Sequence, residues 1–126
     1  MAANDTLVSE SAGRDQEEFH SKIAGVTHGQ GGVNPQRLLK TCRSGQLELI
    51  RDPRNKYDKN AIKVCLPTGE QLGWINRELA KELSELIDNG TQVSAEISEV
   101  TGGTLFKRER GCNIIIAYEE DDGPSA

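Results

Sequence analysis

The sequence predicts an α+β fold, in which five or six short strands form a small curled or barrel-like sheet accompanied by two helices. Short alternating apolar segments are separated by turns rich in glycine and proline, which is typical of a sheet of short strands. Two segments begin with asparagine, a residue that caps helices, and the second has one apolar stripe at helical spacing. A segment near the end is apolar on both faces, which indicates a central strand.

The first half of the chain is predicted to contain two strands and one short helix. Residues 23–26 are a strand candidate and run into a glycine-rich loop. Asn34 can satisfy free N–H groups at a helix start, and Pro35 has a suitable fixed φ for the first helical position. We therefore expect a helix over about residues 35–41, followed by a strand over residues 47–51.

A hairpin and the longest helix are predicted in the middle of the chain. Residues 61–66 place the large apolar side chains Ile62, Val64 and Leu66 on one face, a turn follows, and residues 71–75 return as the second arm. Asn76 can cap a helix over about residues 77–88, which an Asn-Gly pair then ends. The apolar stripe of this helix consists of Leu79, Ala80, Leu83, Leu86 and Ile87.

Two more strands and two tails complete the predicted organisation. Residues 93–97 alternate between apolar and polar side chains, and residues 113–118 form the central strand. Residues 1–18 and 119–126 are acidic and short of large apolar groups, so we expect both to be disordered tails. The folded domain is accordingly predicted to span residues 19–118.

The net charge and the lack of a recognisable targeting segment limit the classes of function to be considered. The net charge of −5 comes from the two predicted tails, which carry −4 each, so residues 19–118 carry +3. A mildly basic domain is compatible with a polyanionic partner, although this charge is equally typical of an ordinary solvated surface. Neither a signal peptide nor a membrane-spanning run is recognisable, and we therefore expect a cytoplasmic protein that does not bind a membrane.

The segment over residues 51–60 carries the most distinctive chemistry. It combines cations, carboxylates and amides with one of only two tyrosines: Arg51, Asp52, Arg54, Asn55, Lys56, Tyr57, Asp58, Lys59 and Asn60. Cations attract phosphates, an aromatic ring stacks on a base, and carboxylates and amides form hydrogen bonds with sugars and base edges. The segment therefore indicates a nucleic-acid-binding loop. The alternative is that its asparagines and aspartates only build turns.

Two motifs of this region resemble the HIRAN domain family. Residues 51–64 read RDPRNKYDKNAIKV, and residues 72–80 read LGWINRELA. The resemblance extends over about residues 20–118 and implies an OB-like β-barrel of five to six strands with two helices. Some members are fused to DNA-remodelling ATPases. This chain of 126 residues has no room for an ATPase and resembles the stand-alone bacterial type.

The resemblance also implies a function and a set of binding residues. It implies a non-catalytic module that binds single-stranded DNA at a free 3′ end, in DNA repair or the processing of stalled replication forks. A helicase or another DNA-processing protein would be a further partner. Asn55 would orient the sugar or base, Tyr57 would pack on the terminal nucleotide, and Asp58 would accept a hydrogen bond from the 3′-hydroxyl.

Other residues complete the binding set that the resemblance implies. Trp74 stands where the family places a ring near the strand, and Arg77 where it places a phosphate contact. Eukaryotic relatives have a basic–aromatic pair after the first strand, and this chain has Thr27 and His28 there, so we expect either a lower affinity or a different ligand. Two loop cations, Arg54 and Lys59, belong to the same predicted surface.

Alternative functions rest on other residues. A protein-interaction adaptor is compatible with a small module that has acidic tails. A metal-dependent hydrolase or nuclease would need an acidic cluster, for which the candidates are Asp52, Asp58 and Glu78. A zinc site would need Cys42, Cys65, Cys112 and His28, but no pair of them has the short ligand spacing of zinc modules. We therefore expect free thiols and no cofactor.

Overall fold

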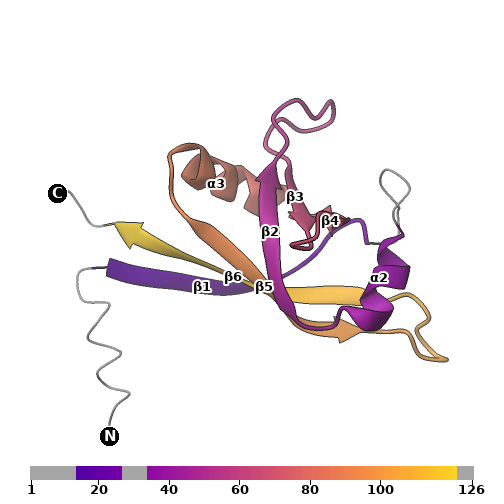
Figure 1. Cartoon of the computed structure of the whole chain (residues 1–126). Helices are drawn as coiled ribbons and strands as arrows, with labels where there is room; N and C mark the ends of the chain where they lie inside the picture. Colours follow the sequence, from indigo (N-terminus) through magenta and orange to yellow (C-terminus); the bar gives the residue numbers. More distant parts are fainter. Residues whose placement is uncertain (1–13, 27–33, 122–126) are drawn as a thin grey trace, which may run out of the picture.

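Six antiparallel strands and two helices make up the described part of the chain, residues 14–26 and 34–121, in a computed structural model (Figure 1). The elements in chain order are β1 (Arg14–Lys22), α2 (Pro35–Thr41), β2 (Gly45–Arg51), β3 (Ile62–Cys65), β4 (Gln71–Trp74), α3 (Arg77–Asp88), β5 (Val93–Thr101) and β6 (Gly111–Asp121). The predicted α+β class with six strands and two helices is confirmed.

The sheet curls because one strand belongs to both of its halves. The strand order is β1-β6-β5-β2-β3-β4, and β2 pairs with β5 through residues 45–47 and with β3 through residues 48–51. Beyond β1, Ala24 exchanges two backbone hydrogen bonds of 2.8 and 2.9 Å with Trp74 at the end of β4. This bridge joins the two edges of the sheet at one point and gives it the form of a small barrel.

The N-terminal boundary of the domain differs from the prediction. Residues 14–18 were expected in a tail and residues 23–26 in a strand, whereas the strand is Arg14–Lys22. All nine residues of β1 pair with β6. This continuous ladder of backbone hydrogen bonds explains why a polar segment with no apolar alternation can form an edge strand. β6 in turn runs to Asp121, into the predicted second tail. Residues 1–13 and 122–126 lie outside the described residues.

Both helices begin and end where the sequence predicts. The side chain of Asn34 accepts hydrogen bonds from the first turn of α2, and Pro35 occupies the first helical position. Asn76 Oδ1 accepts a hydrogen bond of 2.9 Å from the backbone N–H of Leu79 in α3. Gly90 follows α3 with a φ of +95°, a conformation that glycine adopts without a steric penalty.

Buried side chains from every layer fill the inside of the curled sheet. The largest fully buried ones include Leu39, Ile62, Leu72, Leu83, Ile114 and Ile116. Two of the three cysteines, Cys65 in β3 and Cys112 in β6, are buried free thiols as predicted. Burial raises the pKa of the Cys112 thiol to about 11, so this group stays protonated at neutral pH. Among the residues described, no helix combines the length and apolarity that crossing a membrane requires.

Candidate nucleic-acid interface

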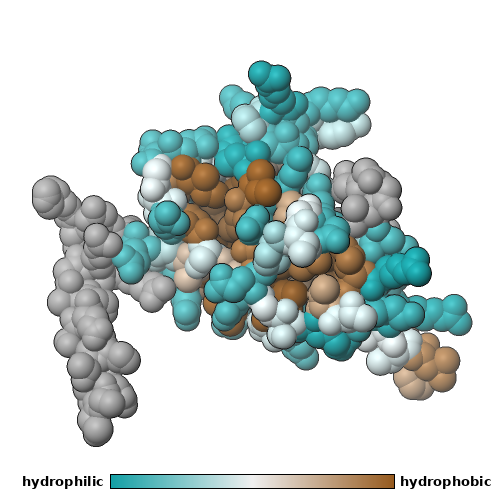
Figure 2. Space-filling view, in the orientation of Figure 1, coloured by the Kyte–Doolittle hydropathy of each residue, from teal (hydrophilic) through white to brown (hydrophobic). Residues whose placement is uncertain are grey.

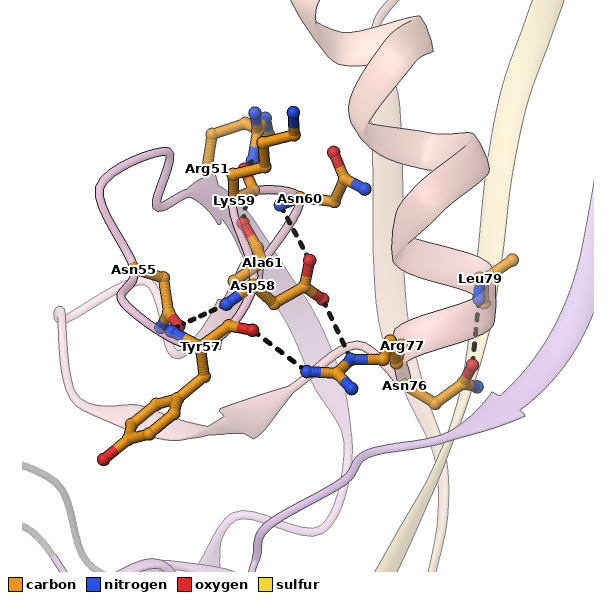
Figure 3. A network of polar contacts seen from close by, with 10 residues as sticks. All are labelled: Arg51, Asn55, Tyr57, Asp58, Lys59, Asn60, Ala61, Asn76, Arg77 and Leu79. Carbon is orange, nitrogen blue, oxygen red and sulfur yellow. Dashed lines mark hydrogen bonds and ion pairs between the residues drawn. The ribbon is translucent and has the colours of Figure 1, made fainter.

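The loop between β2 and β3 is built around the side chain of Asn55 (Figure 3). Its Oδ1 accepts hydrogen bonds from the backbone N–H of Tyr57 at 2.9 Å and of Asp58 at 3.0 Å. Its Nδ2 donates to Asp52 Oδ2 at 3.2 Å. Asn55 therefore builds the turn, and the same contacts fix the backbone at Tyr57 and Asp58.

The carboxylate of Asp58 joins this loop to the start of α3. Asp58 Oδ1 accepts a hydrogen bond of 3.0 Å from the backbone N–H of Asn60, and Oδ2 lies 3.5 Å from Arg77 Nε. Arg77 Nη2 also donates to the carbonyl oxygen of Tyr57 at 3.0 Å. Figure 3 shows both contacts crossing from the loop to the guanidinium, so two segments 19 residues apart in sequence are held together.

The ring of Tyr57 points away from this network (Figure 3). Tyr57 is 77% exposed, which is unusual for a residue with a large aromatic side chain. The Lys56 ammonium lies 5.5 Å from the ring centroid, within the range of a cation–π contact. An exposed ring with a cation beside it offers a flat face for a base and a charge for a phosphate.

A cleft of about 370 Å³ lies between this loop and the start of α3. Its lining combines aromatic, charged, amide and apolar side chains: Asn55, Tyr57, Asp58, Ala61, Trp74, Ile75 and Arg77. Trp74 is half-buried and stands at the end of β4, where its backbone is hydrogen-bonded to Ala24. The structure thus brings together five of the predicted binding residues in one concave site, whose volume is typical of small-ligand pockets.

Two of the remaining predicted residues, Arg54 and Lys59, are described by the structure and do not line this cleft. Arg54 and Lys59 are exposed on the same loop and add positive charge beside it. Thr27 and His28 lie outside the described residues. Within the described ranges, no three histidine, cysteine or acidic side chains are grouped as metal ligands would be.

Sequence reasoning missed two residues of the cleft and one exposed loop tip that does not line it. Ala61 and Ile75 were read only as strand residues, although both also line the cleft. The tip of the β5–β6 loop exposes Leu105 and Phe106, the latter at 97%, next to a basic stretch, and Figure 2 shows apolar surface at this tip, at the lower right. Two adjacent apolar residues between a glycine pair and several cations were the available signal for an exposed tip.

Arg51 anchors the far end of the loop. Its Nη1 donates to the carbonyl oxygens of Lys59 at 3.0 Å and Ala61 at 2.9 Å. Its Nε and Nη2 reach the two carboxylate oxygens of Asp88 at the end of α3, at 3.0 and 3.1 Å. The hydrogen bond from Arg51 lowers the pKa of the Asp88 carboxyl. The ionised carboxylate therefore stabilises the fold at pH values above its ordinary pKa. This contribution is lost as the pH falls through the lowered pKa of the folded state.

Arg51→Ala is expected to lower the free energy of unfolding by about 1–3 kcal/mol, because two backbone carbonyls lose a charged donor. Urea denaturation followed by circular dichroism measures this change. Asp88→Asn is the matched control, since it removes only the exposed carboxylate, whose ion pair is screened by solvent, and it should cost clearly less than Arg51→Ala. Equal losses in both variants would show that the carbonyl contacts of Arg51 contribute nothing.

Known proteins resemble this chain in sequence and in fold. The model of the HIRAN domain family matches residues 16–118. The crystal structure of the HIRAN domain of human HLTF has a TM-score of 0.65 and 26% identity, covering 87% of this chain and 82% of that one. The structure of the same domain in its DNA-bound conformation has a TM-score of 0.55 and 26% identity, covering 83% and 76%.

A curated human relative, helicase-like transcription factor, is 39% identical over 67 residues, which is 53% of this chain. The chain spans only 6% of the length of that relative. The structural likeness confirms the predicted OB-like barrel.

Proposed function

Because this chain belongs to the HIRAN domain family, we propose that it is a non-catalytic module that binds single-stranded DNA at a free 3′ end, in the cleft between the β2–β3 loop and α3. One observation carries the proposal: an exposed ring, a carboxylate and a guanidinium meet in that cleft, at Tyr57, Asp58 and Arg77. A relative of similar fold is known in a DNA-bound conformation, which supports DNA as the ligand.

Each group of the cleft has a distinct task in this proposal. The ring of Tyr57 stacks on the terminal nucleotide, and the guanidinium of Arg77 attracts a phosphate. Asp58 accepts a hydrogen bond from the 3′-hydroxyl, for which its carboxylate keeps acceptor capacity beyond the contacts with Asn60 and Arg77. The half-buried indole of Trp74 forms part of the wall.

The 3′ end is tested with two oligonucleotides of one sequence, which end in a 3′-hydroxyl and in a 3′-phosphate. Fluorescence anisotropy is expected to show that the phosphate weakens binding about tenfold or more, because the terminus loses its donor and brings a second anion towards Asp58.

Asp58→Asn is the control, because its amide oxygen can still accept from Asn60 N–H while the charge is gone. The penalty for the 3′-phosphate should shrink in this variant. Equal affinity of the unmodified protein for both oligonucleotides would remove the role of Asp58.

The proposal includes a setting. A module that captures free 3′ ends without cutting them suits DNA repair or the processing of stalled replication forks. It would act together with a helicase or another DNA-processing protein. The similarity to helicase-like transcription factor supports this setting.

A further inference from the structure

A second hollow lies between α3 and the paired strands β1 and β6, and it shares no lining residue with the cleft. It has a volume of about 480 Å³ and adjoins another of about 310 Å³, with which it shares Phe19, Leu79 and Glu82. The two hollows therefore form one groove, referred to here as the α3 groove. In Figure 1 α3 lies above β1 and β6, and residues of these two strands line the groove opposite the helix.

Apolar side chains form the floor of the α3 groove. Leu79, Leu83 and Leu86 of α3 face Phe19 of β1 and Tyr118 of β6. The rings of Phe19 and Tyr118 meet edge to face with centroids 6.2 Å apart. Four of these residues are only half-buried, although they pack against the core. The fold thus leaves contiguous apolar surface accessible here.

An acidic stripe borders this floor. Glu78, Glu82 and Glu85 line the groove at the helical spacing i, i+4, i+7, and the three leucines follow the same spacing one residue later. All three glutamates are exposed. In the described ranges none of them has a cationic partner, and neither lysine nor arginine lines the groove.

We propose that the α3 groove binds a cationic amphipathic helix of another protein, independently of DNA. Two parallel stripes at helical spacing, one apolar and one acidic, match a helix whose apolar stripe is flanked by lysine or arginine. The undescribed ends of this chain carry no such segment, because residues 1–13 and 122–126 are net acidic. A second copy of this chain is also disfavoured as the partner, because its α3 would place glutamates opposite the glutamates of the groove.

The test uses a fluorescein-labelled peptide of leucine and lysine, as long as α3, with leucines at the spacing of one helical stripe. Anisotropy is expected to show saturable binding. A peptide of the same composition with scrambled order should bind at least about tenfold more weakly, because it has no stripe to match the leucines of α3.

Charge reversal on the rim is the decisive variant. The double substitution Glu82→Lys and Glu85→Lys changes exposed side chains only and is expected to weaken peptide binding about tenfold or more. Glu96→Lys is the matched control: it makes the same type of change at an exposed residue of β5 outside the groove and should leave affinity unchanged.

Three outcomes would overturn the proposal. In the first, the striped and scrambled peptides bind with the same affinity. In the second, Glu96→Lys weakens peptide binding as much as the double substitution does. In the third, the double substitution leaves the affinity for the peptide unchanged. The first two would show general attraction between opposite charges, and the third would place the peptide elsewhere on the protein. Leu86→Gln adds an apolar readout, since it keeps the rim charges and should also weaken binding several-fold if the groove is the site.

Discussion

Gly73→Ala is expected to lower the free energy of unfolding by about 3 kcal/mol or more, the largest loss we predict for a single methyl group. A Cβ atom at position 73 would lie 2.3 Å from the carbonyl oxygen of Ala24 and 2.6 Å from Ile23 Cγ2. The oxygen cannot retreat freely, because it accepts the hydrogen bond from Trp74 N–H. The substitution would therefore force apart the bridge that joins the two edges of the sheet.

Urea denaturation of the purified variant measures this loss. Gly90→Ala is the matched control, because its added Cβ meets no atom within 4 Å and costs only the strain of a φ of +95°, about 1 kcal/mol. The two variants should differ clearly in stability. If the Gly73→Ala variant were as stable as Gly90→Ala, or more stable, Ala24 could not lie as close to β4 as the structure places it.

Tyr57→Ala is expected to weaken binding of single-stranded DNA by about 1–3 kcal/mol, which is the usual value of one base–aromatic stack. The free energy of unfolding should hardly change, since the residue is 77% exposed and the loop contact of Tyr57 uses its backbone carbonyl. Anisotropy with a short oligonucleotide measures the first quantity and thermal unfolding the second.

Tyr57→Phe separates stacking from hydrogen bonding. It keeps the ring and removes only the hydroxyl, so the affinity should stay close to that of the unmodified protein. An unchanged affinity in Tyr57→Ala would mean that the DNA contacts another surface, whereas an equal loss in both variants would assign the effect to the hydroxyl.

The sequence predicted best those elements whose local pattern and tertiary role agree. α3 has a capping asparagine, one apolar stripe and a closing glycine, and its bounds Arg77–Asp88 match the prediction. β1 is the opposite case, since Phe19 is its only large apolar residue and exposed glutamates precede it. Its stability comes from pairing with β6, about a hundred positions away, which no local pattern reveals.

The candidate site was predicted in composition but not in geometry. The loop residues Asn55, Tyr57 and Asp58 stand together in one motif, so the sequence and its family resemblance single them out as candidates. The contacts of Arg77 with that loop depend on how β4 and α3 are placed by the whole sheet. The apolar groove beside α3 escaped notice for the same reason, because its leucines were read as ordinary core residues.

The guanidinium of Arg77 also bears on how much entropy binding would cost. It holds the backbone of Tyr57 and the carboxylate of Asp58 at once, while Asn55 ties the same residues from the other side. A segment that is held by contacts on two sides loses little conformational entropy when a ligand binds. Preorganisation of this kind lets a small surface bind tightly with few contacts, and it makes rigidity, as much as charge, a source of affinity.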